Sequence, residues 1–131
     1  MNRIFTEKDI QQFADFVQDE DPVHFKLDAL KSLGFEKTFV YGMMPTSLFT
    51  KLYLKTFISP VYLSQSVNFL LPIYVDEEIE VKCTVTALET TKSNKIKCTL
   101  NSTVRKISKD SMAISGTGLL LLKPETVDIV K

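Results

Sequence analysis

The chain has 131 residues, 44% of them hydrophobic, and its 16 basic residues balance its 16 acidic residues. This length predicts a single domain over residues 1–131 with a core that needs no disulfide. The zero net charge argues against nucleic acid as a partner, because phosphate binding needs a local positive excess. The N-terminal MNRIFTEKDI has no apolar signal core and no membrane-spanning helix is expected, so we expect a cytoplasmic protein.

The N-terminal part of the chain is predicted to be helical. Thr6 and Asp9 have the spacing of a capping box, with Asp in place of the usual Glu. An apolar stripe at helical spacing follows, formed by Ile10, Phe13, Ala14 and Val17. Pro22 disfavours helical backbone in the residue before it, so this helix should end near Asp19 or Glu20.

Two further helices are predicted before residue 60. The stretch LDALKSLG, residues 27–34, fits a short helix with Gly34 at its C-terminal cap. Its inward side chains are expected to be Leu27, Leu30 and Leu33. A longer helix near residues 43 to 57 has apolar residues on more than one face, which predicts a buried helix. Pro45 falls in its first turn, where a missing N–H costs nothing.

After residue 60 the apolar spacing changes from a helical period to alternation. Strands are predicted over residues 61–75, 78–88, 95–104 and 111–122, with turns at residues 75–77, 92–94 and 109–110. Short connections make successive strands antiparallel neighbours. The pattern predicts an α+β fold in which a curved antiparallel sheet wraps one long central helix.

Most familiar catalytic and metal sites are absent from the sequence. Cys83 and Cys98 lie in predicted strands and are interpreted as reduced, partly buried thiols. No Cys or His lies at metal-ligand spacing, so no metal site is predicted. The G-x-S-x-G motif of serine hydrolases does not occur.

The stretch DEDPVH, residues 19–24, contains the chain's only histidine. Pro22 fixes its own φ, so Asp19 and His24 flank a stiff bend. In such a bend their side chains can face one point and share a water molecule. Spacing alone favours the simpler interpretation, a helix-ending turn with a partly exposed histidine.

Gly42 directly precedes the long predicted helix. The first N–H groups of a helix lack partners, and the helix dipole adds positive potential there. Glycine lets a ligand oxygen approach the backbone, which suits an oxyanion hole for a thioester carbonyl. Taken alone, this feature is better explained by a tight turn into the helix.

Together these segments resemble the MaoC-like family of (R)-specific enoyl-CoA hydratases. The family pattern is roughly D-x-N-P-[ILV]-H, a short helix, G-F, then an H-G-M turn opening a long helix with S-L. The matching residues are Asp19, Pro22, Val23, His24, Asp28, Gly34, Phe35, Gly42, Met43, Ser47 and Leu48. A later family segment, Q-x-x-x-F-x-x-P-[VI]-x-x-x-D, is matched by Gln65, Phe69, Pro72 and Asp76.

The resemblance implies a single hot-dog fold that works as a homodimer. It also implies reversible addition of water to a trans-2-enoyl-CoA, giving the (R)-3-hydroxyacyl-CoA without a cofactor. The catalytic pair of the family falls on Asp19 and His24, and its backbone donor to the thioester carbonyl falls on Gly42. Which of the two side chains acts as acid and which as base stays open.

Two positions depart from the family pattern. Asp21 replaces an Asn, and its charge, if buried, would favour a protonated His24 or a neutral Asp21. Tyr41 replaces a His, and it is interpreted as a change beside the catalytic pair rather than a loss of it. The acyl tail is expected between the long helix and the sheet. The candidate substrate-binding residues are Tyr41, Met43, Met44, Ser47, Thr50 and Phe69, together with Leu71.

Two alternatives to a hydratase stay open at this point. A hot-dog thioesterase would use the same oxyanion donor with a reactive group on the long helix, where only Ser47 and Thr50 qualify. A non-catalytic subunit that binds acyl thioesters would need an active partner. In every case the expected partner is a thioester of CoA or of acyl carrier protein.

Overall fold

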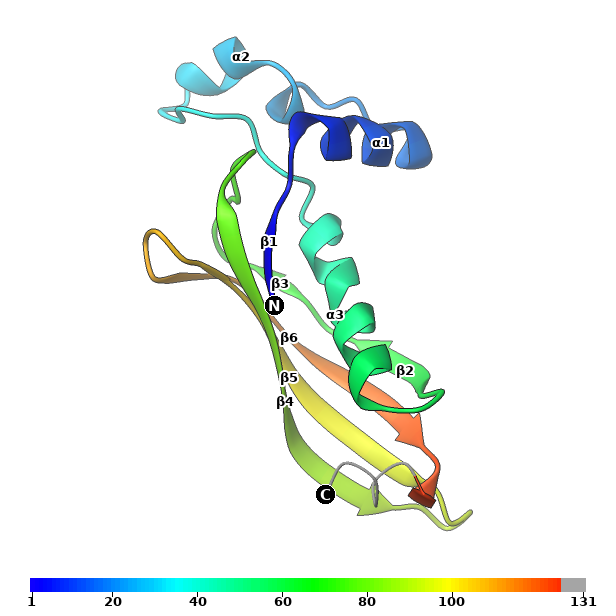
Figure 1. The fold of residues 1–131 in the computed structure, drawn as a ribbon. Helices are drawn as coiled ribbons and strands as arrows, with labels where there is room; N and C mark the ends of the chain where they lie inside the picture. The colour runs from blue at the N-terminus through cyan, green and yellow to red at the C-terminus, as the bar shows by residue number, and fades with distance from the viewer. Residues whose placement is uncertain (126–131) are drawn as a thin grey trace.

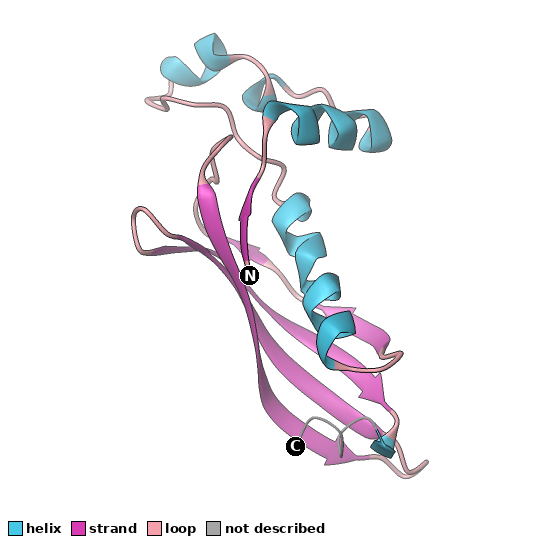
Figure 2. Ribbon diagram, in the orientation of Figure 1, coloured by secondary structure: helices cyan, strands magenta, loops and turns pink. Residues whose placement is uncertain are grey.

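The computed structural model describes residues 1–125, in which one long helix lies along a curved antiparallel sheet (Figure 1). The helical elements are α1 (Glu7–Val17), a 3-10 turn η1 (Pro22–His24), α2 (Leu27–Lys31) and α3 (Met43–Thr56). The strands are β1 (Asn2–Ile4), β2 (Val61–Gln65), β3 (Asn68–Phe69), β4 (Glu78–Thr90), β5 (Ile96–Lys106) and β6 (Ser111–Leu122). Figure 2 shows α3 beside the sheet, with α1 and α2 gathered at one end of the molecule.

The sheet has the strand order β1-β4-β5-β6-β2, and β3 pairs with β6 next to β2. All of these pairings are antiparallel, as the short connections predicted. At each predicted turn one Asp or Asn adopts positive φ, with values of 64° at Asp76, 60° at Asn94 and 45° at Asp110. These residue types tolerate the left-handed region, which explains why the chain reverses there. The structure confirms the α+β architecture with a central helix.

The core lies between α3 and one face of the sheet. Phe49 and Tyr53 of α3 are almost completely buried. On the core face of β5, alternate residues are buried, namely Cys98, Leu100, Ser102, Val104 and Lys106. Burial of each large apolar side chain contributes about 1.5–3 kcal/mol to stability. The period of two that predicted the strands is therefore the pattern that packs them against α3.

Helix α1 begins with the predicted capping box, in which Thr6 and Asp9 exchange side-chain and backbone hydrogen bonds. It ends at Val17, earlier than predicted, because Gln18 takes a left-handed conformation with φ of 58°. Of the three leucines expected to point inward in the second helix, Leu30 is fully buried but Leu33 is 68% exposed. That expectation was wrong for Leu33, because α2 ends at Lys31.

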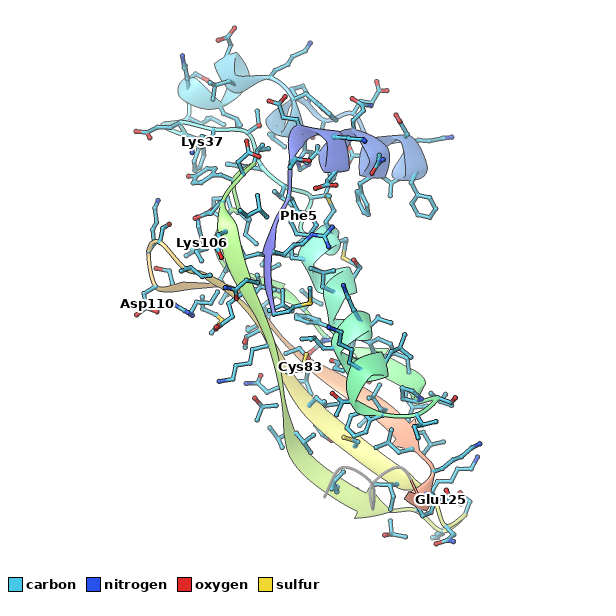
Figure 3. All side chains as sticks on the ribbon, in the orientation of Figure 1. Phe5, Lys37, Cys83, Lys106, Asp110 and Glu125 are labelled. Atoms are coloured by element: carbon cyan, nitrogen blue, oxygen red, sulfur yellow. The ribbon has the colours of Figure 1, made fainter. Side chains whose placement is uncertain are left out.

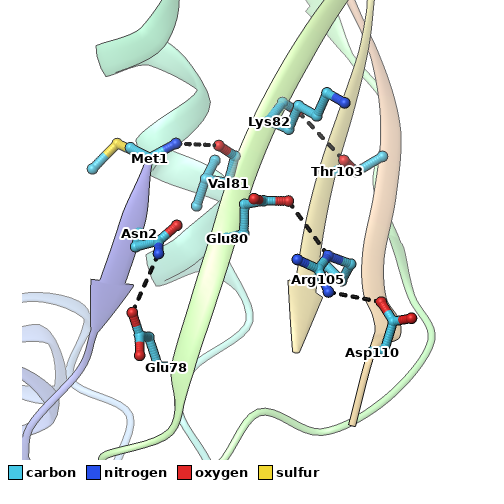
Figure 4. A network of polar contacts seen from close by, with 9 residues as sticks. All are labelled: Met1, Asn2, Glu78, Glu80, Val81, Lys82, Thr103, Arg105 and Asp110. Atoms are coloured by element: carbon cyan, nitrogen blue, oxygen red, sulfur yellow. Dashed lines mark hydrogen bonds and ion pairs between the residues drawn. The ribbon is translucent and has the colours of Figure 1, made fainter. Parts of the chain in front are cut away.

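Two features of the sheet differ from the prediction. Strand β1 was not predicted; it pairs with β4 from Asn2 opposite Glu80, and the Met1 amino group adds a hydrogen bond to the Val81 carbonyl (Figure 4). The single strand expected over residues 61–75 is divided into β2, β3 and an irregular segment. Within that segment, the N–H groups of Leu70 and Leu71 both reach the Ala113 carbonyl, so regular pairing ends there.

Both thiols are free, with Cys83 half-buried and Cys98 buried. Burial raises the pKa of each thiol above its usual value. Within residues 1–125 no helix is long and apolar enough to cross a membrane. The same residues contain no group of three or more side chains suited to holding a metal ion.

Candidate active site

A pocket of about 740 Å³ lies where the end of α1, the turn η1, the start of α3 and the segment after β3 meet. Its wall includes five of the predicted site residues from the first half of the chain: Asp19, His24, Tyr41, Gly42 and Met43. The end of β3 and the segment after it supply a largely apolar wall, formed by Phe69, Leu70, Leu71, Pro72 and Ile73. One carboxyl side chain, one imidazole and the start of one helix therefore line a single, largely apolar cavity.

Local hydrogen bonds shape the turn that carries the acidic residues. The Asp19 carboxylate accepts the Asp21 N–H at 2.9 Å, and the Asp21 carboxylate accepts the Val23 N–H at 3.1 Å. Pro22 occupies the first position of η1, where it needs no N–H partner. Short Asp side chains favour such backbone contacts, so the sequence DEDPVH folds into a bend that places Asp19 and His24 on the same pocket.

The His24 ring has a defined tautomer. Its Nδ1 lies 2.8 Å from the Phe39 carbonyl oxygen, and a carbonyl oxygen only accepts. Nδ1 therefore carries a proton, and the neutral ring presents a lone pair at Nε2. The Phe39 N–H donates to the Val23 carbonyl at 2.9 Å, so two hydrogen bonds join η1 to the segment before α3.

Tyr41 contacts both Asp19 and His24 and is 5% exposed. Its hydroxyl donates a hydrogen bond to the main-chain carbonyl of Asp19, and its ring stacks on His24 with centroids 3.7 Å apart. Phe13 of α1 packs against it at 5.0 Å. Burial raises the pKa of the Tyr41 phenol above its usual value, and the charge of Asp19 raises it further. The phenol therefore stays protonated and remains a donor.

Gly42 is the residue before α3, and it presents a free donor. Its N–H donates to no acceptor within residues 1–125, whereas the Met44 N–H bonds the Tyr41 carbonyl at 2.9 Å. A β-carbon placed on Gly42 would lie 2.5 Å from the Phe69 ring. The Phe69 ring occupies the space that a side chain would need, so only glycine fits here while the ring keeps this position, and the Gly42 N–H lies at the start of a 14-residue helix, where the dipole favours negative charge.

A buried ion pair fixes the pocket wall after β3. Lys106 of β5, labelled in Figure 3, lies with its Nζ 3.2 Å from the Glu77 carboxylate and 2.6 Å from the Pro72 carbonyl. The neighbouring Ile73 carbonyl accepts the Val40 N–H at 2.8 Å. The ion pair is therefore linked through the wall to the segment that leads into Tyr41.

Three predicted substrate-binding residues do not line this pocket. Met44 and Ser47 lie instead along a separate groove of about 320 Å³ between α1, β1 and α3. Thr50 is exposed and lines neither cavity. The Ser47 hydroxyl donates to the Met44 carbonyl at 2.6 Å. The cause is the direction of the side chains on α3: successive helical residues point about 100° apart, and of this helix only Met43 faces the pocket.

Several wall residues were not predicted from the sequence, namely Phe13, Val17, Phe39, Val40, Leu70, Ile73 and Ile114. All are apolar, and no motif distinguishes them from core residues. Phe69 and Leu71, which were predicted, do line the pocket.

Comparison with known proteins identifies relatives of this chain. The family model described as MaoC like domain matches residues 2–107. A mitochondrial 3-hydroxyacyl-[acyl-carrier-protein] dehydratase of Arabidopsis thaliana is 35% identical over 94 residues, which are 72% of this chain and 57% of that protein. The (R)-specific enoyl-CoA hydratase of Aeromonas caviae is 31% identical over 90 residues, which are 67% of each chain.

Solved structures share the fold. An (R)-hydratase from A. caviae superimposes with a TM-score of 0.81 at 28% identity, covering 95% of this chain and 92% of that one. This confirms the hot-dog fold. The chain spans about half of the length of the two plant dehydratases it matches, 57% for Arabidopsis thaliana and 47% for Solanum lycopersicum. The family match extends over most of the chain, and the protein therefore belongs to the MaoC-like domain family.

Proposed function

We propose that the protein is a hydro-lyase that adds water reversibly to a trans-2-enoyl thioester and gives the (R)-3-hydroxyacyl thioester. One observation carries this proposal: Asp19, His24 and the free N–H of Gly42 line a single apolar pocket. The Nδ1–H of His24 is held by the Phe39 carbonyl, which leaves Nε2 for proton transfer. The names of the A. caviae hydratase and the plant dehydratases support the same reaction class.

The reaction needs two proton transfers and one site of charge stabilisation. Water must lose a proton as its oxygen bonds C3, and C2 must gain a proton. Asp19 and His24 line the same pocket and supply one carboxylate and one imidazole for these transfers. Negative charge develops on the thioester oxygen between the two steps, and the Gly42 N–H is the donor that would stabilise it.

The substrate class follows from the rest of the pocket wall. Phe69, Leu70 and Leu71 give an apolar surface suited to an acyl chain. We propose a thioester of CoA or of acyl carrier protein as substrate, with no cofactor. Ser47 and Thr50 lie outside this pocket, which argues against a thioesterase that uses a nucleophile on α3.

We also propose that the protein works as a homodimer. Large apolar side chains of the pocket wall are exposed to solvent: Met43 is 55%, Phe69 57% and Leu70 53% exposed. Phe69 belongs to β3, which pairs with β6 as the edge strand β2 does, and Val61 of β2 is 55% exposed. An uncovered sheet edge beside apolar side chains favours pairing with a second copy. Light scattering at micromolar concentration should give twice the chain mass, and a stable monomer would contradict the proposal.

The cytoplasmic location expected from the N-terminal sequence is part of this proposal. The two plant relatives are mitochondrial proteins. Fractionation of source cells, followed by detection of the protein in each fraction, shows whether it is cytoplasmic or mitochondrial.

An assay with crotonyl-CoA tests the reaction class directly. Loss of the enoyl absorbance without release of thiol is the expected result. Release of free CoA would instead identify a thioesterase. Binding without any chemical change would identify a non-catalytic subunit, and either result would reject the hydro-lyase.

A further inference from the structure

We infer that Tyr41 is a positioning residue that fixes the Asp19 segment and the His24 ring in one geometry. The inference rests on the proposed function, because positioning matters only if these two side chains act together. Tyr41 stands where the family pattern has His, so the role belongs to this chain's own residue. It touches both members of the pair through different parts of its side chain.

The hydroxyl of Tyr41 fixes the backbone of Asp19. Asp19 follows Gln18, which ends α1 with a left-handed conformation, and its side chain is exposed. Local turn hydrogen bonds alone would leave this segment free to move relative to the core. The Tyr41 hydroxyl joins the Asp19 carbonyl to a residue that is 5% exposed. A buried hydroxyl without a partner is costly, so this hydrogen bond persists.

The ring of Tyr41 fixes the plane of His24. The two rings stack with an angle of 23° between their planes, while Nδ1 of His24 is bonded to the Phe39 carbonyl. One constraint acts on the edge of the imidazole and the other on its face. Together they determine the direction of Nε2. Phe13 packs on Tyr41 at 5.0 Å and supports its position from α1.

A tyrosine performs this task without adding a charge. Burial, followed by the nearby carboxylates of Asp19 and Asp21, raises the pKa of the phenol above its usual value. It therefore remains a neutral donor throughout the neutral range. A histidine at this position would change charge near pH 6.5 and alter the field at the catalytic pair. The geometry provided by Tyr41 should thus be independent of pH near neutrality.

Two substitutions separate the hydroxyl from the ring. Tyr41→Phe removes the hydrogen bond to Asp19 and keeps the stacking, so we expect kcat to fall on the order of 10-fold to 100-fold with little change in KM. Tyr41→Leu also removes the stacking and should lower kcat further. Tyr53→Phe is the matched control, since Tyr53 is 2% exposed and its hydroxyl bonds Ser102 at 2.6 Å, away from the pocket. It should lose stability but keep kcat.

Nuclear magnetic resonance provides a second measurement that needs no activity. The chain has one histidine, so its ring proton signals belong to His24 without further assignment. The stacked tyrosine should shift these signals upfield. Tyr41→Phe should keep most of the shift, Tyr41→Leu should abolish it, and Tyr53→Phe should leave it unchanged.

The two measurements distinguish failure of the inference from failure of the proposed reaction. If Tyr41→Phe keeps wild-type kcat, or if Tyr41→Leu leaves the His24 signals unchanged, Tyr41 is not a positioning residue. If the wild-type protein does not hydrate crotonyl-CoA, the proposed function fails, and the His24 signals alone decide whether Tyr41 fixes the ring.

Discussion

Replacing Lys106 by methionine should destabilise the protein by breaking a buried ion pair. Lys106 is 2% exposed, and the side chain of its partner Glu77 is 9% exposed. Methionine fills a similar volume but provides no cation. The Glu77 carboxylate would keep only the Tyr74 N–H, which it accepts at 3.1 Å, and the Pro72 carbonyl would lose its donor. An unpaired carboxylate would then remain in an environment with little water.

The expected loss is large for a single substitution. Breaking one side of a buried ion pair costs about 3–5 kcal/mol. In a domain of this size the melting temperature falls by roughly 3–4 °C for each kcal/mol, so the expected decrease is about 10–20 °C. Thermal unfolding followed by circular dichroism measures it, and urea unfolding gives the free energy independently.

The adjacent residue provides the control. Arg105 also forms ion pairs, at 3.4 Å with Glu80 and 2.7 Å with Asp110, but these groups are in contact with solvent (Figure 4). Exposed pairs contribute little to stability, so Arg105→Met should hardly change the melting temperature. If Lys106→Met is no more harmful than Arg105→Met, the reasoning from burial is refuted. The double substitution Lys106→Met with Glu77→Leu should recover much of the loss, because no charge is left unpaired.

Two predictions concern the proposed catalytic groups. Asp19→Asn and His24→Ala should each lower kcat for crotonyl-CoA about 10²–10⁴-fold at nearly constant KM. The double variant should lose little more activity than the less active single variant. A near-normal kcat in Asp19→Asn would show that this carboxylate takes no part in the mechanism. Gly42→Val should abolish turnover but keep the fold, because the Phe69 ring that its β-carbon would meet is 57% exposed and can move aside. Normal kinetics in that variant would contradict the oxyanion role of Gly42.

The fold was predictable where its causes are local. The change from helical spacing to alternation after residue 60, and the turns at Asp76, Asn94 and Asp110, follow from neighbouring residues. Strand β1 has three residues, too few to show a period, and its place in the sheet depends on Glu78–Glu80 far along the chain. The division of residues 61–75 was also not predictable, because alternation does not reveal where a partner strand stops pairing.

The candidate site likewise has residues that the sequence predicted and residues that only the structure reveals. The motif around Asp19, His24 and Gly42 was recognised from the sequence, and the structure places all three on one pocket. The apolar helix α3 offered no signal for which of its faces meets the cavity, so the sequence could not show that Met44 lies outside this pocket. The link from Tyr41 to Asp19 joins residues 22 positions apart through a main-chain oxygen, which no spacing rule reveals.

Asp21 is the remaining departure from the family pattern, and its role can be tested. Its carboxylate accepts the Val23 N–H at 3.1 Å at the start of η1, and its side chain is exposed. An Asn side chain has an oxygen that can accept the same bond, so the turn before His24 depends on an acceptor and not on a charge.

Asp21→Asn should therefore retain kcat for crotonyl-CoA and the wild-type melting temperature. Asp21→Ala removes the acceptor, which typically costs about 0.5–2 kcal/mol at a helix start, and should also lower kcat by loosening the turn that carries His24. Measurement of kcat and of thermal unfolding for both variants shows whether Asp21 acts as a hydrogen-bond acceptor or through its charge. If Asp21→Asn loses as much activity as Asp21→Ala, the negative charge of Asp21 itself acts on Asp19 and His24, and the explanation by a shared acceptor is wrong.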